Sequence, residues 1–291
     1  MLNGHPGGGH HADILERLPD RLWQVTSVEK LCDLLFEASN EDRLRILIKL
    51  DEESMNITQL SRELGLSTQE TSRHINRLNE VELTTKDPDG LNRLTPFGRL
   101  TLRQLSGLEF VSRHKEYFSN HTLAGLPQEL VSRLGDLVGC RALDHVLASW
   151  GNVEDTILDA EEHVWAVTDQ YSSTTYRLMA EALDRGVTLR LIEPRDWAPL
   201  PSHLNDIRPE DAETFNRART RNLLQERVLG SLDFFLYMSE KRAAALAFPD
   251  RDGRLDYTGF TSADERARGW CGDLFRHYWE RAEPRREFVI K

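Results

Sequence analysis

The chain has 291 residues, of which 39% are hydrophobic and 29% charged, and its net charge at pH 7 is -11. This length suits two domains with separate cores. No apolar run approaches the roughly 18 residues of a membrane span, so we expect a cytoplasmic protein without a membrane segment. The acidic balance argues against a protein that coats nucleic acid nonspecifically, because Lys and Arg supply most of the affinity for phosphates. Any contact with DNA must therefore be local.

The first 25 residues and the cysteines favour neither a structural metal nor a cofactor, although His5, His10 and His11 could hold a metal loosely. Residues 1–25 open with a Gly- and His-rich stretch that lacks the basic and apolar regions of a secretory signal, and we expect a disordered leader. The cysteines lie far apart and form no Cys-x-x-Cys pair, which disfavours disulfides and thiolate zinc sites: Cys32, Cys140 and Cys271. We therefore expect reduced thiols, no metal and no cofactor.

Helical periodicity and capping residues predict a series of helices after the leader. Thr26 and Glu29 have capping-box spacing ahead of an apolar-periodic stretch, and Asn40 is placed to cap a second helix. A short helix then carries Leu60 and Leu64 on one side and ends at a Gly65 turn. A further helix is expected from about residue 68 to 81, which completes a helix-turn-helix.

The helix after the turn has one apolar and one polar face. Ser67-Thr-Gln-Glu70 is a second capping box that fixes its start. Thr71, Ile75 and Leu78 fall on one side, and Gln69, Ser72, Arg73 and Asn76 fall on the other. Gln and Asn can pair bidentately with adenine, and Arg with guanine. The sequence predicts these DNA-binding residues: Thr68, Gln69, Ser72, Arg73 and Asn76 on the helix, with Arg77 and Arg93 on backbone phosphates.

A turn sequence after this helix predicts a wing. Residues 83–86 and 91–94 flank Asp87-Pro-Asp-Gly90, with Pro and Gly where a tight reversal needs them. Thr95-Pro96 then opens a helix that serves as a linker or a dimerisation helix. Helix, turn, helix and hairpin together predict a winged helix-turn-helix over residues 26–112 that binds double-stranded DNA.

The motifs of this region resemble a known family. The stretches 57–67 and 71–78, followed by Leu83, are similar to the ArsR-like winged helices of archaea and bacteria. The resemblance implies a regulator that contacts DNA through this domain.

The second half of the chain has the pattern of an α/β domain over residues 151–291. A strand at 164–167, a helix at 174–185 and a strand at 187–192 predict a parallel βαβ unit. A further strand pair is expected at 232–238 and 243–248. A last helix over about 263–282 carries an apolar stripe that we expect to face the core. The fold class is therefore a winged helix-turn-helix (α+β) followed by an α/β domain, joined by a helical connector at 113–150.

Polar side chains after the predicted strands indicate an effector site, because ligands of open α/β sheets bind beyond the carboxyl ends of the strands. Arg195 beside Trp197 could take an anion against an aromatic wall. The predicted effector-binding residues are Thr168, Asp169, Gln170, Tyr171, Arg195, Trp197 and Ser239.

A second resemblance covers most of residues 28–283. The motifs that carry it are Tyr117-Phe-Ser-Asn-His121, Leu126-Pro127, Arg133-Leu134, the stretch 232–241, Phe248-Pro-Asp, Gly253, Trp270 and Leu274-Phe275. They are similar to archaeal methanogenesis regulators of the FilR type and, more distantly, to the TrmB family. The resemblance implies a winged helix with a C-terminal domain that receives a small-molecule effector.

Three classes of function stay open from the sequence. The first is an effector-responsive DNA-binding regulator, expected as a homodimer because two recognition helices read a palindrome. The second is a winged helix used only as a protein adaptor, which the acidic net charge permits. The third is a DNA-associated hydrolase, but the chain lacks the His-x-Lys of a phospholipase D-like nuclease and other catalytic motifs. We expect no catalytic residues.

Overall fold

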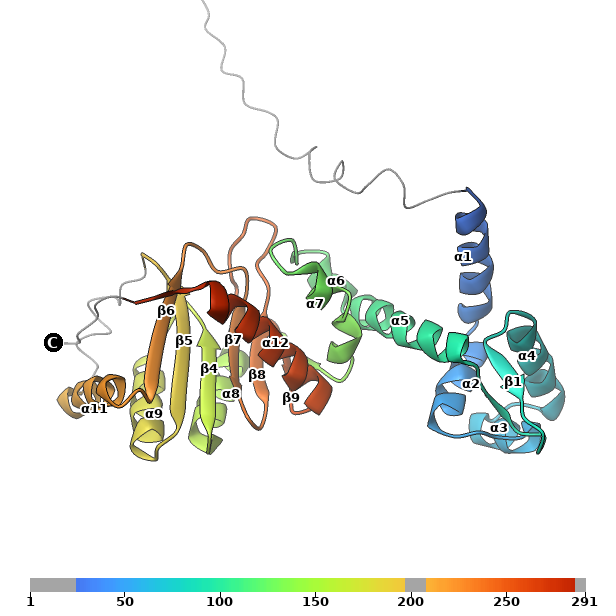
Figure 1. Cartoon of the computed structure of the whole chain (residues 1–291), viewed down its shortest axis with the longest axis horizontal. Helices are drawn as coiled ribbons and strands as arrows, with labels where there is room; N and C mark the ends of the chain where they lie inside the picture. Colours follow the sequence, from blue (N-terminus) through green and yellow to red (C-terminus); the bar gives the residue numbers. More distant parts are fainter. Residues whose placement is uncertain (1–24, 197–207, 286–291) are drawn as a thin grey trace, which may run out of the picture. The chain divides into compact units, whose positions relative to one another are not determined.

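A computed structural model describes residues 25–196 and 208–285. The chain divides into two compact units, the first ending at Leu102 and the second beginning at Arg103 (Figure 1). The predicted leader up to residue 24 lies outside the described part, and so does the side chain of Thr26. Within the described residues, no helix is long and apolar enough to cross a membrane.

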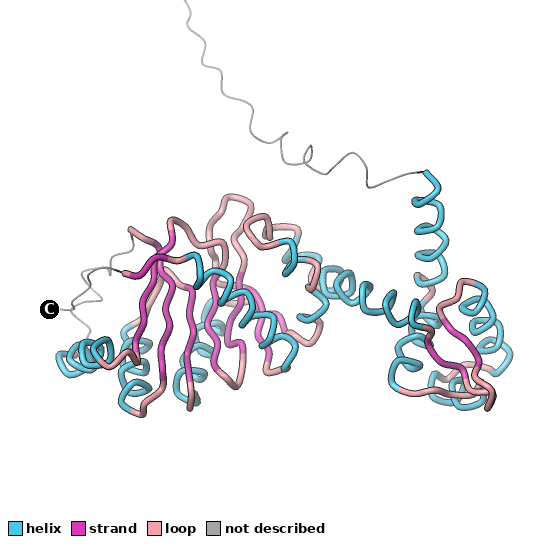
Figure 2. Tube along the Cα trace, viewed as in Figure 1, coloured by secondary structure: helices cyan, strands magenta, loops and turns pink. Residues whose placement is uncertain are grey.

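Unit 1 consists of helices and one short hairpin (Figure 2). Its elements are α1 (Val25–Ala38), α2 (Glu41–Glu52), α3 (Ile57–Leu64), α4 (Thr68–Glu80), β1 (Thr84–Lys86), β2 (Asn92–Leu94) and the start of α5 (Pro96–Arg113). Asn40 caps α2 by accepting a hydrogen bond from the backbone N–H of Arg43, as its sequence position predicts. Thr95 Oγ1 accepts from the Gly98 N–H at the start of α5. The predicted helices and hairpin are confirmed.

The core of unit 1 joins α2, α3, α4 and the hairpin. Leu47, Leu60, Leu78 and Leu83 are fully buried in one cluster. Lys86 pairs with Asn92 across the antiparallel hairpin. These contacts hold the wing and α4 to the same core.

Unit 2 is built on an eight-stranded mixed sheet in the order β10-β6-β5-β4-β7-β8-β9-β3. The strands are β3 (Arg141–Leu143), β4 (His163–Val167), β5 (Thr188–Pro194), β6 (Leu224–Leu229), β7 (Phe235–Ser239), β8 (Ala243–Ala247), β9 (Gly259–Ser262) and β10 (Glu283–Pro284). β4, β5 and β6 are parallel, whereas the other pairings are antiparallel. The predicted βαβ unit is confirmed as β4, α9 and β5.

Helices cover both faces of this sheet (Figure 1). The longer ones are α8 (Val146–Asp159), α9 (Ser173–Asp184), α11 (Pro209–Thr220) and α12 (Glu265–Arg281); the short ones are α6 (Lys115–Phe118), α7 (Gln128–Val131) and the 3-10 helix η2 (Leu134–Leu137). Residues of α8, α9 and α11 form the core on one face, and residues of α12 form it on the other. Trp270, Leu274 and Phe275 of α12 are fully buried, so the apolar stripe faces the core as predicted.

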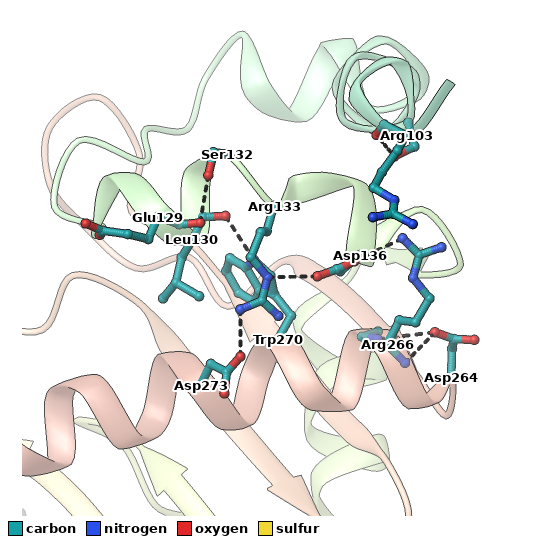
Figure 3. A network of polar contacts seen from close by, with 12 residues as sticks. Arg103, Glu129, Leu130, Ser132, Arg133, Asp136, Asp264, Arg266, Trp270 and Asp273 are labelled. Atoms are coloured by element: carbon teal, nitrogen blue, oxygen red, sulfur yellow. Dashed lines mark hydrogen bonds and ion pairs between the residues drawn. The ribbon is translucent and has the colours of Figure 1, made fainter. Parts of the chain in front are cut away.

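Residues 113–150 differ from the helical connector that the sequence suggests. They include β3, which pairs with β9 at the end of the sheet, and α7 and η2, whose leucines lie in the core under α12. Polar contacts fasten this segment to α12 (Figure 3): Arg133 pairs with Asp273 at 2.7 Å, Asp136 pairs with Arg266 at 3.0 Å, and Trp270 Nε1 donates to the Leu130 carbonyl at 3.0 Å. The segment is therefore part of unit 2.

Candidate nucleic-acid interface and effector site

Helix α4 has a start fixed by reciprocal hydrogen bonds. Ser67 Oγ accepts from the Glu70 N–H at 3.2 Å, and Glu70 Oε2 accepts from the Ser67 N–H at 3.1 Å, which is the predicted capping box. Hydrogen bonds from Ser67 hold the pKa of the Glu70 carboxyl below its usual range. Gly65, at φ 69°, makes the left-handed turn between α3 and α4. The sequence thus sets the angle at which α4 leaves the turn.

The two faces of α4 differ in exposure as predicted. Thr71, Ile75 and Leu78 are buried against the core of unit 1. On the opposite face, four side chains are exposed and Ser72 is half-buried; the exposed ones are Thr68, Gln69, Arg73 and Asn76. Within the part of the chain that the structure describes, Arg73 has no ion-pair partner. This face therefore presents amide, hydroxyl and guanidinium groups to an outside partner.

The two predicted phosphate-contacting arginines have different environments. Arg93 lies in the middle of β2, opposite Thr85, and its side chain is exposed on the wing. Arg77 instead forms a two-point ion pair with Glu37 of α1, with Nε 3.0 Å from Oε2, and its guanidinium lies 5.9 Å from the Phe36 ring centroid. The hydrogen bond from Arg77 holds the pKa of the buried Glu37 low. The structure thus leaves Arg93 accessible and engages Arg77 within the fold.

The carboxyl ends of β4 and β5 bring a buried polar cluster together. Tyr171, after β4, donates its hydroxyl to Glu193 Oε1 of β5 at 2.7 Å, and Arg285 Nη2 lies 3.1 Å from Glu193 Oε2. Glu193 is 2% exposed, and burial raises its pKa to about 7 in spite of Arg285 and Tyr171, which lower it. Tyr176 of α9 stacks on Tyr171 with ring centroids 5.1 Å apart. A titratable carboxyl is therefore held at this edge of the sheet.

The other predicted effector residues near this edge that the structure describes contact side chains or backbone atoms of unit 2. Thr168 Oγ1 donates to the Gln170 carbonyl at 2.8 Å, and Asp169 Oδ1 accepts from the Tyr257 hydroxyl at 2.9 Å. Arg195 is half-exposed and forms a bidentate pair with Glu283 of β10, with both distances 3.0 Å. Trp197 lies outside the described residues.

Ser239 does not join this edge, and the expectation that it does is wrong. β7 runs antiparallel to β4, and Ser239 pairs with Val164 near the amino end of β4, whereas Leu236 pairs with Val167. The carboxyl end of β7 therefore lies at the opposite edge of the sheet from Thr168. The reason is that strand direction depends on the connection between β6 and β7, which the sequence pattern does not reveal.

Sequence reasoning missed four residues in and beside the cluster. They are Tyr176, Arg285 and the neighbouring ion pair of Arg219 with Glu226, which lie 2.6 Å apart. Tyr176, five residues after Tyr171 at the start of a helix, carried a usable signal. Arg285 carried none, because it reaches Glu193 from 92 positions along the chain, the difference between the two residue numbers.

No metal centre accompanies these groups in residues 25–196 and 208–285, where no three His, Cys, Asp or Glu side chains gather in a way that could hold an ion. Cys140 and Cys271 are buried free cysteines, and burial raises the pKa of the Cys140 thiol to about 11. A thiol with so high a pKa is a poor ligand and a poor nucleophile.

The raised pKa of Glu193 predicts a pH-dependent stability. In the folded chain this carboxyl keeps its proton up to about pH 7, whereas in the unfolded chain it loses the proton near its ordinary pKa of 4.5. Its contribution to stability is therefore complete below about pH 4.5 and is lost as the pH rises through 7. We expect Glu193→Gln to gain stability relative to the natural chain between pH 5 and pH 8, on the order of 2 kcal/mol.

Urea denaturation at pH 5 and at pH 8 measures the free energy of unfolding of the variant and of the natural chain. Glu213→Gln, which changes an exposed glutamate of α11, is the matched control and should follow the natural chain. Parallel pH profiles for Glu193→Gln and the natural chain would contradict the assignment.

Unit 1 is a winged helix-turn-helix and unit 2 is an α/β domain on a mixed sheet, and two family matches define the class as a DNA-binding regulator of transcription. Residues 40–86 match the family described as "Bacterial regulatory protein, arsR family", and residues 153–281 match "Methanogenesis regulatory protein FilR1, middle domain". The chain thus combines an ArsR-type DNA-binding domain with a FilR1-type middle domain, which confirms both resemblances. Both matches are to domains of regulatory proteins. No curated protein matches the chain.

Several solved structures are similar to the chain at low identity. TrmBL2, an archaeal chromatin protein, is 16% identical over 84% of this chain and 94% of that one, with a TM-score of 0.38. NucT from Helicobacter pylori is 10% identical over 50% of this chain and 97% of that one, with a TM-score of 0.36. Nuc from Salmonella typhimurium, a phospholipase D family member, is 9% identical over 46% and 89%, with a TM-score of 0.32. At such TM-scores these likenesses carry no argument about function.

Proposed function

We propose that the protein regulates transcription by reading an operator as a homodimer through α4, under the control of a small molecule bound by unit 2. The observation that carries this proposal is the polar face of α4, whose side chains suit the major groove. Gln69, Arg73 and Asn76 would read bases, with Thr68 and Ser72 on bases or nearby phosphates. Arg93 on the wing would contact the phosphate backbone.

In this proposal Arg77 does not contact DNA directly. It could reach a phosphate only by giving up its pair with Glu37, which would leave a buried carboxylate without that partner. We therefore assign Arg77 the role of tying α4 to α1, and leave the direct contacts to the other residues.

An exposed apolar stripe on α5 supports dimerisation. Phe97 and Leu100, both in unit 1, are 46% and 55% exposed and lie three positions apart on one face of the helix. Exposed apolar side chains that line up on one helix face are typical of a contact with another chain. The second copy would place two α4 helices about one DNA turn apart on a palindrome.

The double substitution Phe97→Ser/Leu100→Ser is expected to convert the dimer to a monomer and to weaken operator binding at least about tenfold, since each monomer would bind a half-site alone. Sedimentation equilibrium measures the first effect. Leu147→Ser, which changes an 85% exposed leucine of α8, is the matched control. A natural chain that sediments as a monomer, or a variant that stays dimeric, would rule out this interface.

The effector proposal concerns the carboxyl edge of β4 and β5. Tyr171 and Glu193 offer buried hydrogen-bonding groups there, and Arg195 offers an exposed guanidinium. Thr168, Asp169 and Gln170 belong to the loop beside them, and the proposal retains Trp197.

The experiment that tests the effector site is DNA binding by the purified protein with and without a metabolite extract. Arg195→Ala should blunt the response, and an unchanged response would count against this residue.

The two alternative functions have less support. A protein adaptor gives no reason for the base-reading side chains on α4, and it would show no sequence preference for DNA at any salt concentration. A phospholipase D-like nuclease would need a His-x-Lys motif to supply its covalent nucleophile, and the chain has no such motif. We therefore propose that the protein is not an enzyme and acts on chromosomal DNA in the cytoplasm.

A further inference from the structure

One face of the unit 2 sheet carries arginine and tryptophan side chains in alternation. Trp165 of β4, Arg190 of β5 and Arg227 of β6 come from the sheet, and Arg276 and Trp279 come from α12. The guanidinium of Arg190 lies 5.8 Å from the Trp165 ring centroid and 5.5 Å from that of Trp279. Arg227 lies 4.5 Å from Trp279, and Arg276 lies 5.8 Å from Trp165. We call these five residues the Arg–Trp ladder.

The ladder lies at the margin of the core under α12, where Trp165 and Trp279 are partly buried against that core. On this face α12 packs against β4, β7 and β8, and Figure 1 shows no helix of the described chain in front of β5 and β6. Arg276 is exposed and the other four side chains of the ladder are half-buried. Cation–π contacts therefore cover the open part of the sheet and hold the guanidinium groups in place.

Arg190 differs from the other two arginines of the ladder in having no polar partner. Arg227 donates to the Trp279 carbonyl at 2.6 Å, and Arg276 pairs with Asp273 at 2.7 Å. Arg190 is hydrogen-bonded through its backbone in the sheet, but its guanidinium makes no hydrogen bond or ion pair with any residue in the described ranges. Its guanidinium lies near two indole rings, and its N–H groups are therefore left for an outside partner.

We propose that the Arg–Trp ladder is a second nucleic-acid contact, which binds the phosphate backbone of duplex DNA without reading its sequence. Guanidinium N–H edges suit phosphate oxygens. Stacking of unpaired bases is disfavoured, because Trp165 already stacks on Phe275 at 4.9 Å and Trp279 on Phe275 at 5.5 Å. The contact is independent of the α4 face.

The test uses the full chain with the α4 face disabled by Arg73→Ala/Asn76→Ala, so that it does not depend on operator recognition. Binding to a labelled duplex of random sequence is measured by fluorescence anisotropy over a salt series. Adding Arg190→Gln should weaken binding about threefold to tenfold and reduce the slope of log K against log salt by about 1, the effect of one lost phosphate contact. Arg190→Lys should restore most of the binding, since it keeps the charge.

The control is Arg254→Gln, which removes an equal charge from an exposed arginine in the loop between β8 and β9; it should leave the slope unchanged. Two results would overturn the proposal. One is equal binding by the Arg190→Gln chain and its parent, which would leave the ladder as a cover for the sheet. The other is a loss of binding caused by dissociation of a dimer in sedimentation, which would make the ladder a protein interface.

Discussion

The double substitution Arg73→Ala/Asn76→Ala is expected to weaken binding to the operator by about 100-fold or more, because each bidentate contact to a base contributes on the order of 1–3 kcal/mol of discrimination. Both side chains are exposed on the polar face of α4, and neither packs in the core. The fold should therefore be retained, and the loss should be greater for the operator than for random DNA. Fluorescence anisotropy with both duplexes measures the two affinities.

Lys49→Ala provides the matched control for this variant. Lys49 is a lysine of α2 in the same unit, and it pairs with Glu52 at 2.8 Å. Its removal takes away one positive charge without touching α4, so we expect operator affinity within about threefold of the natural chain. An Arg73→Ala/Asn76→Ala chain that binds the operator as tightly as this control would contradict the role of α4.

The substitution Gly98→Ala is expected to destabilise unit 1 by about 3 kcal/mol or more. Gly98 is buried in the first turn of α5, and a Cβ there would lie 1.9 Å from the carbonyl oxygen of Leu83 and 2.8 Å from its carbonyl carbon. Backbone atoms cannot move aside as a flexible side chain can. Helix propensity favours alanine over glycine. Any loss of stability therefore reports the close approach of α5 to the Leu83 backbone, just before β1.

Gly151→Ala tests the same change without the steric conflict. Gly151 lies in α8, and a Cβ there would meet no atom within 4 Å. We expect this variant to be unchanged or stabilised by roughly 0.5–1 kcal/mol. Urea denaturation followed by circular dichroism compares the two variants with the natural chain. If Gly98→Ala unfolds at the same urea concentration as the natural chain, the packing of α5 on Leu83 is not as the structure shows.

Local signals explain why unit 1 could be predicted from the sequence. The capping box of Ser67 with Glu70, the Gly65 turn and the Pro–Gly hairpin each depend on residues within a few positions of one another. The free face of α4 follows from helical periodicity alone. The Arg77–Glu37 pair could not be predicted in this way, because the partners are 40 positions apart.

In unit 2, several features depend on contacts between distant residues and could not be predicted from local sequence signals. β6 has Glu226 and Arg227 in its middle, which is a poor pattern for a sheet strand. In the structure Glu226 pairs with Arg219 at 2.6 Å, and Arg227 stacks over Trp279. These partners on other elements compensate the two charged side chains in the strand. The predicted position of Ser239 was wrong for a related reason, because the direction of β7 is set by the topology of the sheet. The Glu193 cluster likewise depends on Arg285 from the end of the described chain.

The measurement that tests the central claim most directly is selection of bound fragments from the host genome by the purified full-length protein, followed by sequencing. The account predicts that the enriched fragments share a palindrome whose half-sites lie about one helical turn apart, and that Arg73→Ala/Asn76→Ala abolishes the enrichment. Fragments without a common sequence, or an enrichment that survives the double substitution, would show that α4 does not read DNA.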